Sequence, residues 1–285
     1  MGGPLATVTG FEYRARMNDP TSSPSDGAPG ALPEHVRDNR AYWDGMAHEW
    51  VEPGERNWAQ AEPTWGIWGL PESELRLLPE RMDGLYTIEL GCGTGYVSGW
   101  MIRRGARAVG IDNSAKQLAT ARRLAGVHGV ELTLVHGNAE EVPYPDASFD
   151  FAISEYGAAI WCDPYRWIPE AHRLLRPGGE LVFLGTHPLA IVCAPYSGKP
   201  TDTRLHRSYF DLHVQDWRDV EVDPGGVEFN LAPSAWMRLF GETGFDVVDF
   251  LELRAPESAS EDRFCIPADW AKRWPSEQAW RLRKR

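Results

Sequence analysis

Strand-like and helix-like segments alternate between residues 85 and 185, and this alternation constrains the fold more than any other feature of the chain. Short apolar runs predict strands, and longer segments between them predict helices. The strands are predicted at 85–90, 108–111, 131–136, 149–154 and 180–185, and the helices at 96–104, 114–128 and 168–175. Such an alternation is typical of α/β proteins, in which a mostly parallel sheet is covered on both faces. Later strand-like runs at 245–253 and 279–284 bring the predicted sheet to seven strands.

The remaining segments are predicted to form a leader, a cap and an insertion. Residues 18–34 lack apolar periodicity, and residues 1–34 are predicted to be a disordered leader. Met17 is an alternative native start to the first residue. Residues 35–285 are predicted to be a single domain. Within it, residues 35–82 would form an N-terminal helical cap and residues 188–232 an insertion after the fifth strand of the alternation.

Local patterns add detail to these segments. Apolar residues at helical spacing predict a helix over 35–50, followed by a loop that ends at a helix opened by Pro71. In the insertion, the stretch 220–229 resembles a hairpin. The next segment, 234–243, predicts a helix that ends at Gly244, a typical stop signal. Ser114 is predicted to cap the helix over 114–128.

Composition narrows the class of protein. The 285 residues carry a net charge of −12, which argues against a broad basic face for nucleic acid. Four widely spaced cysteines favour neither a zinc site nor a disulfide framework; they are Cys92, Cys162, Cys193 and Cys265. No signal peptide or membrane-spanning run is apparent, so a cytoplasmic location is expected. The basic residues 281–285 predict a terminal strand with a solvated face, with a phosphate-contacting tail as the alternative.

The glycine-rich stretch Glu89-Leu-Gly-Cys-Gly-Thr-Gly95 follows the first predicted strand of the alternation. A P-loop would require Lys and Ser or Thr after its last glycine, where this chain has Tyr96. A dinucleotide fingerprint would require glycine at Tyr96 or Ser98, depending on its register. Three glycines before a helix still allow a close approach to a ligand. A ligand with an amino acid portion fits this loop better than a diphosphate does.

Asp112 is the second candidate ligand-binding residue. It lies 21 positions after Gly91, at the end of the second strand of the alternation. In doubly wound sheets, an acidic residue at this place binds ribose hydroxyls. Since a phosphorylated ribose would favour a basic residue instead, the sequence predicts free hydroxyls.

Five segments, in this order along the chain, resemble the class I S-adenosylmethionine-dependent methyltransferases, in particular the small-molecule, type 11-like group. They are Glu89-Leu-Gly-Cys-Gly-Thr-Gly95, Gly110-Ile-Asp112, Gly137-Asn-Ala-Glu-Glu-Val-Pro-Tyr144, Phe149-Asp-Phe-Ala-Ile-Ser-Glu155 and Arg173-Leu-Leu-Arg-Pro-Gly-Gly-Glu180. The resemblance spans about residues 42–253 and implies a Rossmann-like sheet. Asn138 departs from the family pattern, which often has Asp there, but it keeps an acceptor oxygen.

The resemblance implies a site for S-adenosylmethionine and its product S-adenosylhomocysteine. Glu89 and the loop residues Gly91, Cys92, Gly93, Thr94 and Gly95 would hold the methionine end. Asp112 would bind the ribose with Asn113 nearby, and Asn138 and Ala139 would meet the adenine. Glu155 and Tyr156 would lie beside the sulfonium. The predicted cofactor-binding set also includes Gln117, Glu140 and Trp50.

Candidate bases should follow the fourth and fifth strands of the alternation, where open α/β sheets bind ligands. His187 is the first candidate and Tyr156 the second; His206, Tyr209 and His213 rank below them. The alternative for His187 is a loop histidine that bonds to backbone. Tryptophans of the cap, Trp43 and Trp50 among them, are predicted to form a lid, although they could instead pin the cap to the body.

The predicted function is methyl transfer by in-line displacement to a small, apolar or aromatic metabolite. Aromatic residues of the 188–232 insertion favour such an acceptor, although core packing draws on the same residue types. The alternatives are a methyltransferase for a peptide or protein and a non-catalytic cofactor-binding protein. No metal, nucleic acid or membrane partner is expected, and the oligomeric state stays open. The strand-end sequence Ser154-Glu-Tyr-Gly157 lacks the motif of RNA, adenine or glutamine N-methylation.

Overall fold

The computed structural model describes residues 32–210, 212–222 and 224–285. Most of the predicted leader, including Met17, lies outside the described residues. The last leader position, Glu34, is already the first residue of a helix.

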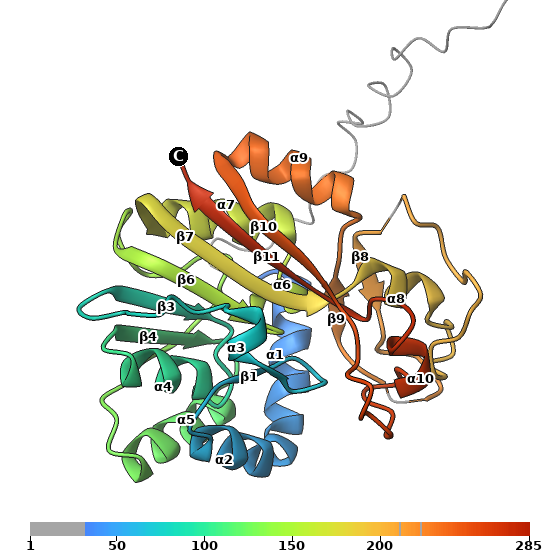
Figure 1. Ribbon diagram of the computed structural model, residues 1–285, viewed down its shortest axis with the longest axis horizontal. Helices are drawn as coiled ribbons and strands as arrows, with labels where there is room; N and C mark the ends of the chain where they lie inside the picture. Colours follow the sequence, from blue (N-terminus) through green and yellow to red (C-terminus); the bar gives the residue numbers. More distant parts are fainter. Residues whose placement is uncertain (1–31, 211, 223) are drawn as a thin grey trace, which may run out of the picture. The chain divides into compact units, whose positions relative to one another are not determined.

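A seven-stranded sheet forms the centre of the domain, in the order β10-β11-β7-β6-β3-β4-β5 (Figure 1). Its strands are β3 Tyr86–Leu90, β4 Arg107–Asp112, β5 Thr133–His136, β6 Phe149–Glu155, β7 Leu175–Thr186, β10 Phe245–Leu253 and β11 Glu277–Lys284. The pairs β3–β4, β4–β5, β3–β6 and β6–β7 are parallel, whereas β11 runs antiparallel to both β7 and β10. The predicted doubly wound, mostly parallel sheet is therefore confirmed.

Helices cover both faces of this sheet, and each face has its own apolar core. The principal ones are α4 Tyr96–Arg103, α5 Ala115–Val127, α7 Pro164–Leu174 and α9 Pro233–Thr243. Trp167 of α7 and Trp236 of α9 share one buried cluster with Leu90 of β3. Trp100 of α4 belongs to a second cluster with Phe151 of β6. Because successive strand residues point to opposite faces, the alternating side chains of β6 contribute to both clusters.

Two local signals fixed helix ends as expected. Ser114 caps α5, where its Oγ accepts a hydrogen bond from the Gln117 N–H at 3.1 Å. At the other end of the domain, α9 stops at Gly244, which adopts a left-handed φ of 104°.

The N-terminal cap is more helical than predicted. After α1 Glu34–Met46 and a 3₁₀ turn Ala47–Trp50, the chain forms α2 Val51–Ala59, where a loop was predicted. Pro53 lies in the first turn of α2, where a missing N–H costs little. Gly54 is buried, and a Cβ there would lie 2.7 Å from Thr94 Oγ1. Pro53 therefore fits the start of α2, and Gly54 allows close packing against Thr94; neither residue marks a loop here.

The rest of the cap is a short hairpin, β1 Thr64–Trp65 with β2 Leu70–Pro71, and the four-residue helix α3 Glu72–Leu75. The helix that was predicted to open at Pro71 is therefore much shorter, because Arg76 turns left-handed with φ of 50°. Its first residue, Glu72, is buried and pairs with Arg104 at 3.0 Å.

Two insertions pack together beyond the sheet (Figure 1). The first carries α8 Pro188–Cys193 and a ladder of β8 Val214–Asp216 with β9 Val227–Phe229. The prediction of a hairpin within 220–229 is wrong. Residues 220–222 form no strand, and β9 pairs with the earlier strand β8 instead. The second insertion, residues 254–276 with α10 Ala268–Ala271, was not predicted; its Trp270 packs in one buried cluster with Cys193 of α8. A short helix, α6 Ala158–Trp161, after β6 was also missed.

The basic C-terminal strand is an inner strand of the sheet. Arg281 and Arg283 of β11 reach Glu180 of β7 at 3.1 and 2.7 Å, so part of the predicted solvated basic face is paired. Among the described helices, none has both the length and the apolarity to cross a bilayer.

Candidate functional site

A cavity of about 1240 Å³ opens at the carboxyl ends of β3, β4 and β6. Its walls come from the glycine loop, the cap and both insertions. Of the predicted cofactor-binding residues, the following line it: Trp50, Glu89, Gly91, Cys92, Gly93, Thr94, Asp112, Asn113, Gln117, Asn138, Ala139, Glu155 and Tyr156. Pockets for drug-sized ligands measure roughly 300–1,000 Å³, so this cavity is larger than a typical pocket for one such ligand.

The three loop glycines have different surroundings. At Gly91, φ is 77° and a Cβ would lie 2.5 Å from Gly157 Cα, so the loop packs against the end of β6. At Gly93, φ is 50° and a Cβ would meet nothing within 4 Å, so this part of the backbone borders open space. Gly95 caps α4 and packs on Ala121, and it does not line the cavity. The structure therefore opens the loop to a ligand at Gly93.

Glu89 is buried directly beneath the loop, with 2% of its surface exposed. Its Oε2 accepts hydrogen bonds from the Ser98 N–H at 2.7 Å and the Ser98 hydroxyl at 2.5 Å. Burial raises the pKa of Glu89 to about 8, against an ordinary value of 4.5. The Lys or Arg partner that would have made this residue purely structural is not present among its described contacts.

Asp112 holds the loop and the next helix through backbone groups. Its Oδ2 accepts from the Gly93 N–H at 2.7 Å, and its Oδ1 accepts from the Ser114 N–H at 2.8 Å. Burial raises the pKa of this carboxyl above its usual range, against the lowering effect of these hydrogen bonds. Each carboxylate oxygen can accept more than one hydrogen bond, so Asp112 can also receive a ligand hydroxyl.

Glu155 and Tyr156 at the end of β6 connect the site to the cap. Glu155 accepts from the Gly66 N–H at 2.8 Å and from the Tyr96 hydroxyl at 2.6 Å, and burial raises its pKa. The Tyr156 hydroxyl donates to Glu277 Oε1 at 2.8 Å, and burial raises the pKa of Tyr156 well above its ordinary value. Glu277 is fully buried, and burial raises its pKa to about 8.

Arg56, Lys199 and Arg263 line the cavity, but the three carboxyl groups at the ends of β3, β4 and β6 have no Lys or Arg partner among the described residues. Within the described parts of the chain, no Lys or Arg forms an ion pair with Glu89, Asp112 or Glu155, and burial raises the pKa of all three. Ionising them together is costly unless a cation enters the cavity. The site therefore fits a positively charged ligand, and Gln117, whose buried Oε1 lacks a partner, offers it a further acceptor.

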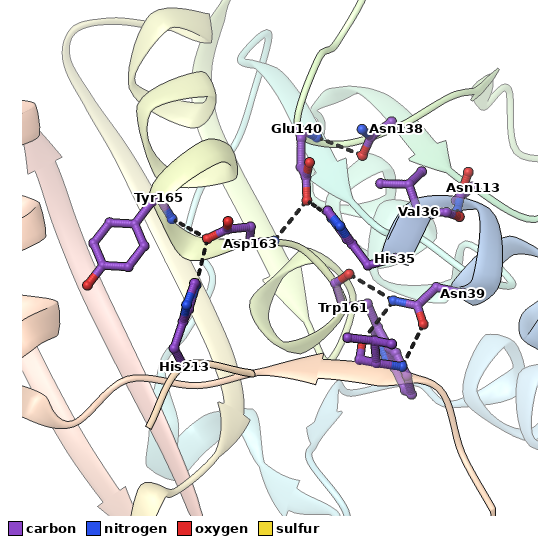
Figure 2. A network of polar contacts seen from close by, with 11 residues as sticks. His35, Val36, Asn39, Asn113, Asn138, Glu140, Trp161, Asp163, Tyr165 and His213 are labelled. Atoms are coloured by element: carbon purple, nitrogen blue, oxygen red, sulfur yellow. Dashed lines mark hydrogen bonds and ion pairs between the residues drawn. The ribbon is translucent and has the colours of Figure 1, made fainter. Parts of the chain in front are cut away.

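Asn113 after β4, and Asn138 and Glu140 after β5, are predicted site residues with different environments (Figure 2). Asn138 is nearly buried, and its Oδ1 accepts from the Glu140 N–H at 3.0 Å, which leaves its amide nitrogen for other contacts. Glu140 does not line the cavity: His35 of α1 lies 2.7 Å from its Oε1, and the Asp163 N–H donates to the same oxygen at 2.8 Å. Asn113 lines the cavity, yet its amide donates to the Val36 carbonyl at 2.7 Å. Glu140 and Asn113 thus anchor α1.

Aromatic rings form the wall on the cap side. Trp50 stacks on Phe264 with ring centroids 6.1 Å apart, and Trp43 contacts both Trp50 and Trp161 edge to face at 5.6 and 5.1 Å. Tyr42 stacks on Trp161 at 5.8 Å, and all five rings line the cavity. Of the cap tryptophans, Trp43, Trp50 and Trp68 line the cavity. Trp58 and Trp65 are fully buried in apolar clusters, as the alternative of pinning the cap to the body expects. Trp161 and Phe264 were missed as site residues, because the helix and the insertion that carry them were not predicted.

His187, the first candidate base, does not line the cavity. Its Nδ1 accepts from the Leu189 N–H at 3.0 Å and thereby caps α8, while its Nε2 lies 3.1 Å from Glu252 of β10. This geometry matches the alternative of a histidine that bonds to backbone. The lower candidates His206, Tyr209 and His213 do not line the cavity either, and His206 and His213 contact Asp202 and Asp163.

Comparisons with known proteins agree with this arrangement. The chain matches the family described as "Methyltransferase domain" over residues 88–183. It is 35% identical over 170 residues to a demethylmenaquinone methyltransferase of Thermus thermophilus, covering 56% of this chain and 74% of that protein. It is 26% identical over 194 residues to 2-methyl-6-phytyl-1,4-hydroquinone methyltransferase 1 of Oryza sativa subsp. japonica, covering 65% of this chain and 55% of the rice protein. The chain thus spans little more than half of that relative's length.

The fold also matches solved structures. A crystal structure of an S-adenosylmethionine-dependent methyltransferase from Mesorhizobium loti superposes with a TM-score of 0.62 at 26% identity. The match covers 77% of this chain and all of that protein.

Proposed function

This chain belongs to the class I S-adenosylmethionine-dependent methyltransferases, and we propose that it methylates a small, apolar, aromatic acceptor of the quinol or phenol type. One observation carries the proposal: a single cavity extends from the glycine loop to a wall of five aromatic rings. Its volume of about 1240 Å³ offers space for an acceptor beside the cofactor. The relatives named for hydroquinone and menaquinone precursors support a ring-shaped acceptor.

The residues around Gly93 fit the cofactor in charge and in hydrogen bonding. We assign Glu89 and the loop to the methionine end, because an ammonium group balances a buried carboxylate. Asp112 would receive the ribose hydroxyls, and Asn138 with Ala139 would border the adenine. Gln117 would satisfy its unpartnered Oε1 on a donor of the cofactor.

When bound, the cofactor supplies a methyl group already activated by the positive sulfur. The protein's own contribution is to align the acceptor with that methyl group and to exclude water. The rings of Trp50, Trp161 and Phe264 suit both tasks, because their flat faces stack on an aromatic acceptor.

A hydroxyl acceptor must also lose a proton, and Tyr156 with Glu277 is our candidate path for it. Tyr156 lines the cavity, and its hydroxyl is committed to Glu277 Oε1. The acceptor proton would move to Tyr156 Oη while the Tyr156 proton moves to ionised Glu277, so that Tyr156 stays neutral throughout. Because burial raises the pKa of Glu277 to about 8, this carboxylate is basic enough for the role.

Binding and turnover experiments test the proposal separately. S-adenosylmethionine and S-adenosylhomocysteine should each raise the melting temperature, since both bind only the folded protein. Turnover is then measured by mass spectrometry with quinols and phenols of increasing size, and with basic peptides as the competing acceptor class. Cofactor binding with methylated peptides only would reject the aromatic acceptor. Cofactor binding without any methylated product would favour the non-catalytic alternative.

A further inference from the structure

A second cavity, of about 300 Å³, lies within the insertion after β7. It is lined by Tyr196, Arg207, Ser208, Leu212, Val214, Gln215, Asp216 and Trp217. Of these residues, only Trp217 also lines the large cavity, so its indole forms a shared wall. The proposed methyl transfer makes no use of this second cavity.

Arg207 is an incompletely satisfied cation in this cavity. Its guanidinium lies between two rings, 4.5 Å from the centroid of Tyr196 and 4.7 Å from that of Trp217. Its Nη2 donates to the Ala194 carbonyl at 2.8 Å, whereas its Nε is buried without a hydrogen-bond partner. Since a buried donor without a partner is costly, an acceptor is expected at this position.

The acidic groups around Arg207 do not supply that acceptor. In the described residues, no carboxylate lies within ion-pair distance of Arg207, and Glu228 acts on it only at longer range. Glu228 instead accepts a hydrogen bond from Trp217. Asp216, at the rim of the cavity, is held by Arg218, whose Nε lies 2.9 Å from Oδ1 and whose Nη2 lies 2.6 Å from Oδ2.

Gln215 provides a second, independent unsatisfied group. The residue is 4% exposed, and its Oε1 is buried without a partner. It belongs to β8, whose pairing with β9 fixes its backbone. A glutamine amide can present either its oxygen or its nitrogen after a 180° flip, so Gln215 can donate a hydrogen bond to an anion.

We propose that this cavity binds the carboxylate of a small organic acid between Arg207 and Gln215. A carboxylate accepts from a guanidinium edge in planar geometry, which the two flanking rings hold in place. A single guanidinium beside Asp216 balances one negative charge, so a dianionic phosphate is less well matched. The apolar side chains of Leu212 and Trp217 fit a compact hydrocarbon body, such as a benzene ring.

Ligand-observed fluorine NMR with 4-fluorobenzoate on the full chain tests this site. The probe should bind saturably and be displaced by benzoate. Arg207→Gln and Gln215→Leu should each weaken binding by about tenfold or more, because each removes a donor to a charged group. Arg207→Lys, which keeps the charge but loses the planar fork, should also weaken it. Arg204→Gln is the matched control, since Arg204 is exposed and outside the cavity. Normal binding of S-adenosylhomocysteine shows that a variant is folded.

Several results would overturn the assignment. Absence of saturable binding would do so, as would equal affinity of the wild type and folded Arg207 and Gln215 variants. Equally tight binding of neutral 4-fluorobenzamide would remove the carboxylate from the proposal, and so would displacement by inorganic phosphate at lower concentrations than benzoate. If S-adenosylhomocysteine displaced the probe, the probe would be bound in the large cavity instead.

The source of the carboxylate follows from turnover with an accepted substrate. Competition of benzoate with that acceptor in the wild type, lost in Arg207→Gln, would mean that the carboxylate belongs to the acceptor itself. Saturable binding without competition would mean that a separate acid occupies the site across the Trp217 wall. Both results support the site, and neither depends on which acceptor is methylated. Competition that persists in Arg207→Gln would place benzoate in the large cavity and overturn the assignment.

Discussion

The proposed cofactor half of the large cavity, around the glycine loop, and its proposed acceptor half, at the aromatic wall, are built in different ways. The cofactor half uses the ends of adjacent parallel strands, and Asp112 and Glu89 act largely through backbone or near-neighbour groups. The acceptor half uses side chains from segments far apart in the chain, such as Trp50 of the cap and Phe264 of the second insertion. The first half is therefore encoded locally, whereas the second exists only when distant segments meet.

The largest effect on turnover should come from Glu277, the hydrogen-bond partner of Tyr156. Glu277→Gln should lower turnover of a hydroxyl acceptor by about 100-fold, because the amide cannot take the Tyr156 proton. In the wild type, turnover should rise with pH through about 8, since only ionised Glu277 is basic. The rise should vanish in the variant, as measured by initial rates between pH 6 and 9 at saturating substrates. A rise that persists in Glu277→Gln would assign the proton to another group.

A change in the cofactor half should leave the acceptor half intact. Asp112→Ala should weaken the affinity for S-adenosylhomocysteine at least about tenfold, on the order of 1.4 kcal/mol, because the variant loses the proposed ribose contacts and the hydrogen bond to the Gly93 N–H. Isothermal titration calorimetry measures the effect, and Asp146→Ala, an exposed carboxylate, is the control. Unchanged affinity in a folded Asp112→Ala variant would remove Asp112 from the site.

A change in the acceptor half should have the opposite selectivity. Phe264→Ala should raise the KM of an aromatic acceptor by about threefold to tenfold, because a stacking face on Trp50 is removed. The affinity for S-adenosylhomocysteine should stay as in the wild type. If Phe264→Ala weakened cofactor binding instead, the boundary between the two halves would be misplaced.

The smallest effect on turnover is expected at His187. His187→Ala should leave kcat unchanged and lower the free energy of unfolding by about 1 kcal/mol, because α8 loses its N-cap. Urea unfolding and steady-state kinetics separate the two effects. A large loss of kcat at wild-type stability would restore His187 as a base, as the sequence alone suggested.

The sequence by itself determined the sheet and most of the cofactor half. Alternating apolar runs predicted each of the seven strands, and Ser114 and Gly244 marked helix ends, because these signals act within a few residues. Glu89 and Asp112 lie at the ends of neighbouring parallel strands, so a sequence motif was enough to bring them to one cavity.

Only the tertiary structure decided what the other polar groups do. His187 and Glu140 occupy the expected loops, but Leu189, Glu252, His35 and Asp163 take up their side chains. Glu277, which was not singled out, reaches Tyr156 because β11 lies next to β7 in the sheet. Apart from the local Leu189 contact, these contacts join residues 23 to 121 positions apart. Their energy depends on burial and orientation, which a local pattern does not record.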